Sequence, residues 1–210
     1  PKTNTNSKFS LTDEEIKEYY SRLTDKKRAT AKKGNFLQVA NQEPGFYIIA
    51  NVFSEPAFAS VVAEALVDSG AVPGFEPAFF THKGMRVDGY NYSEEEATLD
   101  LFIVDFHDDL QVQSLTQTNL DTFLKRAETF FERAVEDDLA WEVDVGSSIW
   151  SLARQLAQMG GSIVRIRLNI LSNAKLSNKI KTLPTKKKDE REWASKVWDL
   201  VAIGRMLSTG

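Results

Sequence analysis

Cysteine is absent from the 210 residues of this chain, and histidine occurs only twice, at His82 and His107. Without cysteine there are no disulfides, no thiolate metal ligands and no cysteine nucleophile, which fits a protein of the reducing cytoplasm. Two histidines without other ligands at suitable spacing exclude a histidine-based zinc site. The sequence also lacks the G-x-S-x-G context of a nucleophilic serine, and Gly160-Gly161 is not followed by the Lys-Ser or Lys-Thr pair of a phosphate loop.

Long hydrophobic runs are missing as well. No apolar run approaches the roughly 18 residues that a membrane span needs, and residues 1–10 are polar, unlike a secretory signal. We therefore expect a protein without membrane association.

Charge of one sign is not in large excess, because 26 basic and 30 acidic residues leave a net charge of -4. The whole molecule therefore does not have the composition of a nucleic-acid-binding protein. The two signs are nevertheless separated along the chain. Acidic residues gather at Glu94, Glu95, Glu96, Asp100, Asp105, Asp108 and Asp109, and basic ones at Arg165, Arg167, Lys175, Lys179, Lys181, Lys186, Lys187 and Lys188. Two interpretations are open: solvated surfaces of opposite sign, or an acidic metal centre beside a phosphate-binding face.

Hydrophobic periodicity and helix caps predict alternating helices and strands. Helices are expected at 12–33, 54–70, 118–138, 148–159 and 201–207, and strands at 85–92, 97–106, 162–171 and 193–200. Residues 46–50 are a short apolar run, and 71–83, 107–116 and 172–189 read as connections. This order is typical of an α/β fold with a mixed sheet flanked by helices. We expect an N-terminal helical segment over 1–53 and an α/β domain over 54–210.

The two strands at 85–92 and 97–106 carry the candidate site. Only four polar residues separate them, so they are expected to pair as an antiparallel hairpin. Asp88 lies in the first strand, while Asp105 and His107 lie two residues apart at the end of the second and so share a face. If the two carboxylates converge, they suit a hard divalent cation such as Mg²⁺. The plainer interpretation is that Asp88 and Gly89 form a bend and Asp105 caps the strand end.

Four segments together resemble the N-terminal part of the abortive infection phage resistance (AIPR) family over roughly residues 55–210. They are Ala57-Phe58 with Glu64-Ala65-Leu66; Arg86-Val87-Asp88-Gly89-Tyr90; Leu99 to Phe106 with Leu115-Thr116; and Val197-Trp198-Asp199-Leu200 running to Arg205 and Ser208-Thr209-Gly210. The resemblance implies a bacterial phage-defence protein with a PD-(D/E)xK, restriction-endonuclease-like core. It also implies a larger C-terminal part beyond Gly210.

The same resemblance assigns roles to individual residues. Glu64 corresponds to the acid of the first helix, Asp88 to the central metal ligand and Asp105 to the second acidic position, so that these three would hold Mg²⁺. His107 stands where the family's fold has a lysine. A neutral imidazole can accept a proton or donate a hydrogen bond, but it supplies no permanent positive charge beside a phosphate.

Two functions are therefore open. One is a metal-dependent endonuclease that attacks invading DNA, with His107 positioning the water. The other is a nuclease-fold module that has lost its chemistry and binds nucleic acid or a protein partner in a defence system. His107 in place of lysine is the feature that separates them.

Overall fold

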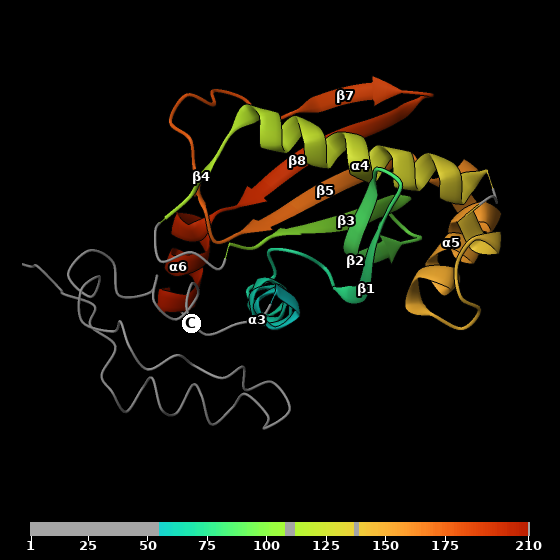
Figure 1. Ribbon diagram of the computed structural model, residues 1–210, viewed down its shortest axis with the longest axis horizontal. Coiled ribbons are helices and arrows are strands. Elements are labelled where there is room, and N and C mark those ends of the chain that lie inside the picture. Colours follow the sequence, from blue (N-terminus) through green and yellow to red (C-terminus); the bar gives the residue numbers. More distant parts are fainter. Residues whose placement is uncertain (1–54, 108–111, 137–138, 210) are drawn as a thin grey trace, which may run out of the picture.

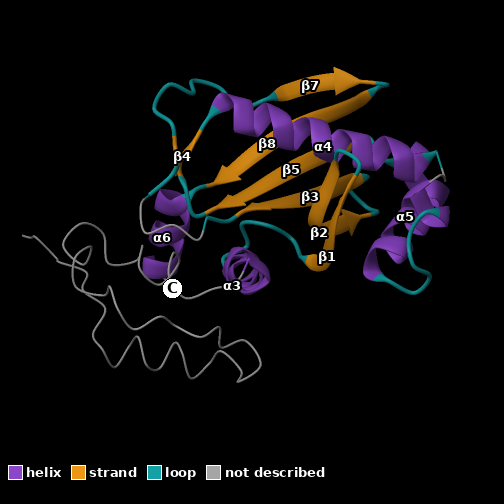
Figure 2. Cartoon of the chain, in the orientation of Figure 1, coloured by secondary structure: helices purple, strands orange, loops and turns teal. Residues whose placement is uncertain are grey.

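A computed structural model describes residues 55–107, 112–136 and 139–209 of the chain (Figure 1). Within these residues, a six-stranded mixed sheet in the order β1-β2-β3-β5-β8-β7 is flanked by helices (Figure 2). The prediction of an α/β fold with a mixed, helix-flanked sheet is confirmed. None of the described helices is long and apolar enough to cross a membrane.

The elements alternate along the chain. The helices are α3 (Glu55–Asp68), α4 (Gln117–Val135), α5 (Ser148–Met159) and α6 (Leu200–Thr209), with short 3₁₀ turns at Leu139–Trp141 and Gly160–Ser162. The strands of the main sheet are β1 (Glu76–His82), β2 (Met85–Ser93), β3 (Thr98–Asp105), β5 (Arg165–Ser172), β7 (Thr185–Lys188) and β8 (Arg191–Trp198). A second, two-stranded sheet pairs β4 (Ser114–Leu115) with β6 (Lys175–Leu176).

Strand β3 lies at the centre of the sheet and joins its two halves. It pairs antiparallel with β2, from Gly89 opposite Phe102 to Ser93 opposite Thr98, so the predicted hairpin is confirmed. On its other side β3 runs parallel to β5, which runs parallel to β8, while β7 is antiparallel to β8. Almost every residue of β3 is buried, because helices cover both of its faces.

Alternate residues of β3 belong to two separate hydrophobic cores. Leu99, Leu101 and Ile103 pack in the larger core with α4 and α5. Phe102 and Val104 pack in the smaller core with α3 and α6. The candidate site lies at the edge of this smaller core, where β2 and β3 approach the start of α3.

All three segments that were predicted as connections contain strands. Residues 71–83 include β1, residues 107–116 include the short β4, and residues 172–189 include β6 and β7. Neither edge strand has a clear alternating pattern: β1 carries Pro77 and an irregular register beside it, and β7 is wholly polar. Their hairpin turns also lack the usual Asn-Gly pair. The residues with a left-handed backbone conformation are Lys83 and Gly84 in the first turn and Asp189 and Glu190 in the second.

Several predicted boundaries shift. Helix α4 is capped by Thr116 rather than starting at Thr118, because Thr116 and Asn119 form a reciprocal capping box, and it ends at Val135 rather than near 138. Strand β5 begins at Arg165 rather than 162, since a 3₁₀ turn occupies Gly160–Ser162. The predicted helix at 12–33, the apolar run at 46–50 and Asp108 and Asp109 lie outside the described residues.

Candidate functional site

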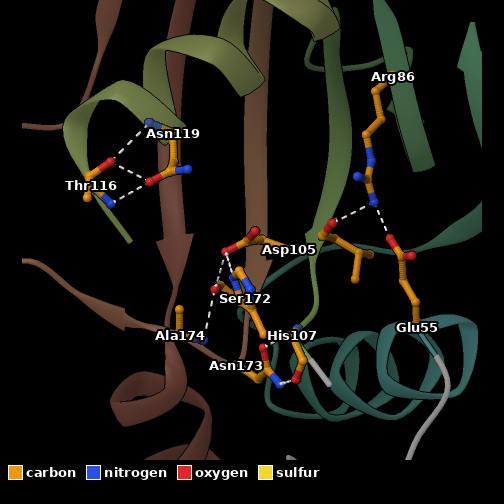
Figure 3. Close-up of polar contacts among 10 residues, drawn as sticks. Glu55, Arg86, Asp105, His107, Thr116, Asn119, Ser172, Asn173 and Ala174 are labelled. Atoms are coloured by element: carbon orange, nitrogen blue, oxygen red, sulfur yellow. Dashed lines mark hydrogen bonds and ion pairs between the residues drawn. The ribbon is translucent and has the colours of Figure 1, made fainter. Parts of the chain in front are cut away.

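Arg86 of β2 is the centre of a polar cluster that faces α3. Its Nε donates to Oδ2 of Asp88 at 2.9 Å, and its Nη2 donates to the main-chain oxygen of Val104 at 2.6 Å. The same Nη2 pairs with Oε1 of Glu55, in the first turn of α3 (Figure 3). One guanidinium therefore contacts two carboxylates and a carbonyl oxygen that come from three different elements.

The backbone explains why Asp88 turns toward this cluster. The regular pairing of β2 with β3 ends at Gly89 opposite Phe102. Beyond that point the main-chain N–H of Val104 donates to Oδ2 of Asp88 at 2.7 Å, so a side chain takes the place of a backbone acceptor. Gly89 is required at the same place, since a Cβ there would lie 2.2 Å from an atom of the Phe75 ring. The Asp88-Gly89 pair thus marks an irregular point in the strand.

Burial and charge set the ionisation of this cluster. The side chains of Asp88, Arg86 and Glu55 are 5%, 18% and 43% exposed, respectively. Burial raises the pKa of the Asp88 carboxyl above its usual value, although Arg86 and the Val104 N–H oppose this rise. Burial also acts to lower the pKa of Arg86, but Asp88 and Glu55 outweigh it and raise the pKa further. Arg86 therefore stays charged at any physiological pH.

A pocket of about 280 Å³ opens beside the cluster. The charged residues Glu55, Arg86 and Asp88 contribute to its lining, and the rest comes from the start of α3 and from β1, through Pro56, Phe79, Phe80 and Thr81. Small ligands or side chains of a partner can reach the guanidinium from this side.

Asp105 and His107 form a second group at the end of β3. Oδ2 of Asp105 lies 3.1 Å from Nε2 of His107 and accepts a 2.7 Å hydrogen bond from the Ser172 hydroxyl. Ser172 lies there because β3 and β5 pair in parallel with Asp105 opposite Ser172. Asn173 holds the main chain of His107 on both sides, accepting from its N–H at 2.9 Å and donating to its carbonyl oxygen at 2.8 Å. The His107 side chain is 36% exposed and is held beside Asp105.

The structure thus places the predicted site residues in different surroundings. Asp105 and His107 are brought together, whereas Asp88 is bonded to Arg86 and to the main-chain N–H of Val104. Glu64 is exposed on α3. Among the described residues, no group of three or more His, Asp or Glu side chains is placed to hold a metal ion. A Mg²⁺ site at Glu64, Asp88 and Asp105 stays a prediction.

Two residues that the sequence reasoning did not single out are central to the cluster. Glu55, the first residue of α3, supplies the acid that contacts Arg86. Arg86 belongs to the motif Arg86-Val87-Asp88-Gly89-Tyr90, and its spacing from Asp88 is a signal in the sequence. Because residues two apart in a strand share a face, the spacing predicts that Arg86 lies on the same side of β2 as Asp88.

Asp100, the other acid of β3, belongs to a buried structural network. Its carboxylate accepts two hydrogen bonds from Arg167, at 2.8 and 2.7 Å, and one from Asn169 at 3.0 Å. Asn169 in turn accepts from the indole of Trp198 at 3.3 Å. All of these groups satisfy one another, so the Asp100 carboxylate serves the internal structure of the sheet.

The lysine-rich segment of β7 is paired with acids on α4. Lys188 lies 3.0 Å from Oε1 of Glu128 and also contacts Glu132, and Lys186 contacts Glu128. These lysines are therefore neutralised within the fold, and so is Arg167 through Asp100. In the part of the predicted basic face that these residues form, acidic side chains of the same fold balance most of the positive charge.

A comparison with known families adds one finding. The model of the abortive infection phage resistance protein N-terminal domain matches residues 58–205. The matched stretch contains Arg86, Asp88 and the Asp105 group, while Glu55 lies just before it. No curated protein and no solved structure matches the chain.

Proposed function

This chain belongs to the abortive infection phage resistance family, through its N-terminal domain, and we propose that it is a nuclease-like module that binds a partner without cleaving nucleic acid. The observation that carries this proposal is the position of Arg86. Metal-assisted phosphodiester hydrolysis needs carboxylates that are available to a cation. Asp88, the central ligand that the family resemblance implies, instead holds a permanently charged guanidinium.

The order of elements supports the nuclease-like part of the proposal. Helix α3 is followed by the antiparallel meander β1-β2-β3, then by helices α4 and α5, and then by β5, which runs parallel to β3. Asp88 on the second strand and Asp105 at the end of the third fall on neighbouring strands of one sheet. This is the arrangement expected of a restriction-endonuclease-like core.

The distribution of charge and apolar surface favours a protein partner over nucleic acid. Lys186 and Lys188 of β7 are paired with Glu128 and Glu132, which removes part of the electrostatic attraction for phosphate. Between α4 and α5, Trp141 and Val145 are 82% and 81% exposed. Tryptophan is enriched among the residues that contribute most to protein–protein binding, which supports a protein partner.

A metal-dependent endonuclease is the second candidate, and the contact of His107 with Asp105 favours it. The imidazole is held 3.1 Å from a carboxylate and remains partly exposed, which suits a group that positions a water molecule. In this candidate Glu64, Asp88 and Asp105 would hold Mg²⁺, which would neutralise charge on the phosphate. Arg86 would first have to leave Asp88.

A cleavage assay distinguishes the two candidates. We expect the wild-type chain to leave supercoiled plasmid, single-stranded DNA and RNA intact with saturating Mg²⁺ or Mn²⁺. Cleavage that requires metal and is abolished by Asp88→Asn, but not by Asp68→Asn, would overturn the proposal and establish the endonuclease. Asp68 is a suitable control because it is exposed near the end of α3.

A further inference from the structure

The oxygen atoms around Arg86 form the kind of set that usually surrounds a metal ion. Asp88 Oδ2 and the Val104 main-chain oxygen lie 2.9 and 2.6 Å from nitrogens of the guanidinium, and Glu55 Oε1 contacts it as well. Two carboxylates and a carbonyl are hard oxygen donors, which Mg²⁺ and Mn²⁺ prefer. In this protein the cation that they surround is part of the chain itself.

We propose that the guanidinium of Arg86 occupies a divalent-cation site formed by Glu55, Asp88 and the Val104 carbonyl, so that metal binds there only when Arg86 is removed. This inference deepens the proposed function, because it gives the physical reason why Asp88 does not take part in metal-dependent cleavage. It also identifies Glu55, rather than Glu64, as the acid of α3 that belongs to the site.

The charges account for the exclusion of metal. Glu55 and Asp88 together carry two negative charges, and Arg86 returns one positive charge to them. A divalent ion at the same place would be repelled by the guanidinium at short range, in surroundings that screen the repulsion poorly. Without the guanidinium the two carboxylates would repel each other, as the effect of Glu55 on the pKa of Asp88 already shows. A divalent cation would then balance both charges.

The pocket provides access for an ion. Glu55, Arg86 and Asp88 line the same opening of about 280 Å³, which β1 borders with Phe79 and Thr81. Shortening or neutralising Arg86 therefore leaves the carboxylates of Glu55 and Asp88 in contact with a space that solvent ions can enter.

The test compares Mn²⁺ binding by the wild-type chain and by Arg86→Met, using thermal unfolding and the electron paramagnetic resonance signal of unbound Mn²⁺. Methionine provides an unbranched, apolar side chain in place of the charged guanidinium. We expect the Tm of Arg86→Met to rise with Mn²⁺ concentration, as mass action requires for an ion that binds the folded state. Its affinity should exceed that of the wild type by about tenfold or more.

Two double variants assign the binding to this site. Arg86→Met with Asp88→Asn should lose the Mn²⁺ effect, and Arg86→Met with Asp68→Asn should keep it. If Arg86→Met folds only when Mn²⁺ is added, that result also supports the proposal, since the metal then replaces the missing charge.

Three results would overturn the inference. One is a folded Arg86→Met that gains no Mn²⁺ affinity, and another is an Arg86→Met that stays unfolded with and without Mn²⁺. The third is a wild-type chain that already binds Mn²⁺ as tightly as Arg86→Met and loses it in Asp88→Asn. None of these readouts uses a nucleic acid, so they are separable from the cleavage that would overturn the proposed function.

Discussion

Arg86 Nε lies 2.9 Å from Asp88 Oδ2, although the two residues are only two positions apart in one strand. Their side chains share a face of β2, and the same Asp88 oxygen also receives the Val104 N–H at 2.7 Å. Asp88 thereby links its ion pair with Arg86 to the place where β2 and β3 meet. An acid that the family resemblance assigns to metal binding is used here for the internal structure of the sheet.

Removal of the Asp88 carboxylate should destabilise the domain. Asp88→Ala leaves a buried Arg86 with only Glu55 as its counter-ion and leaves the Val104 N–H without its acceptor. Loss of one partner of a buried pair costs about 3 kcal/mol. Urea denaturation should show this loss, whereas Asp68→Ala, at an exposed position, should change the free energy of unfolding by less than about 0.5 kcal/mol. Equal stability of the two variants would contradict a structural role for Asp88.

Addition of a single methyl group at residue 89 should also be destabilising. The new Cβ of Gly89→Ala would lie 2.2 Å from the Phe75 ring, which is packed against Phe102 with ring centroids 5.0 Å apart. Overpacking of this kind costs about 1–3 kcal/mol. Gly161→Ala is the matched control, because a Cβ there has no atom within 4 Å. Denaturation curves should therefore separate the two glycine variants, and a neutral Gly89→Ala would show that the Phe75 contact is not tight.

Tyr90 should make the stability of the domain fall at high pH. Burial, together with the 2.7 Å hydrogen bond to Glu76 and the charge of that carboxylate, raises the pKa of Tyr90 to about 12. The unfolded chain loses this proton first, near pH 10. The contribution of Tyr90 is thus fully present below about pH 10 and is lost as the pH rises toward 12. Thermal unfolding across this range should show a shallower decline for Tyr90→Phe than for the wild type, and parallel curves would contradict the assignment.

The central hairpin could be predicted from the sequence because its signals are local. Two apolar runs separated by four polar residues admit an antiparallel pair, and the structure has that pair. The period-2 pattern of β5 and the amphipathic pattern of α4 were equally direct. Strands β1 and β7 were missed because edge strands need no buried face. Lys186 and Lys188 of β7 acquire their partners only when α4 packs beside them.

The site shows a similar division between local and long-range information. The contact between Asp105 and His107 follows from their spacing at the end of a strand. The contact between Glu55 and Arg86 joins residues 31 positions apart, and it depends on how α3 packs over the sheet. No pattern within either segment predicts this contact. The same is true of Ser172, which reaches Asp105 only through the parallel pairing of β3 with β5.

The most direct test of the account is a plasmid-cleavage assay on the wild-type chain and on His107→Lys, each with saturating Mg²⁺ and with Mn²⁺. Lysine at position 107 restores the permanent positive charge that the family's fold places beside the phosphate, where charge develops during attack. If Arg86 prevents metal ions from binding at the site, the added lysine does not restore cleavage. We therefore predict that both folded proteins leave the plasmid supercoiled. Metal-dependent nicking by the wild type, or nicking that rises in His107→Lys, would contradict the account.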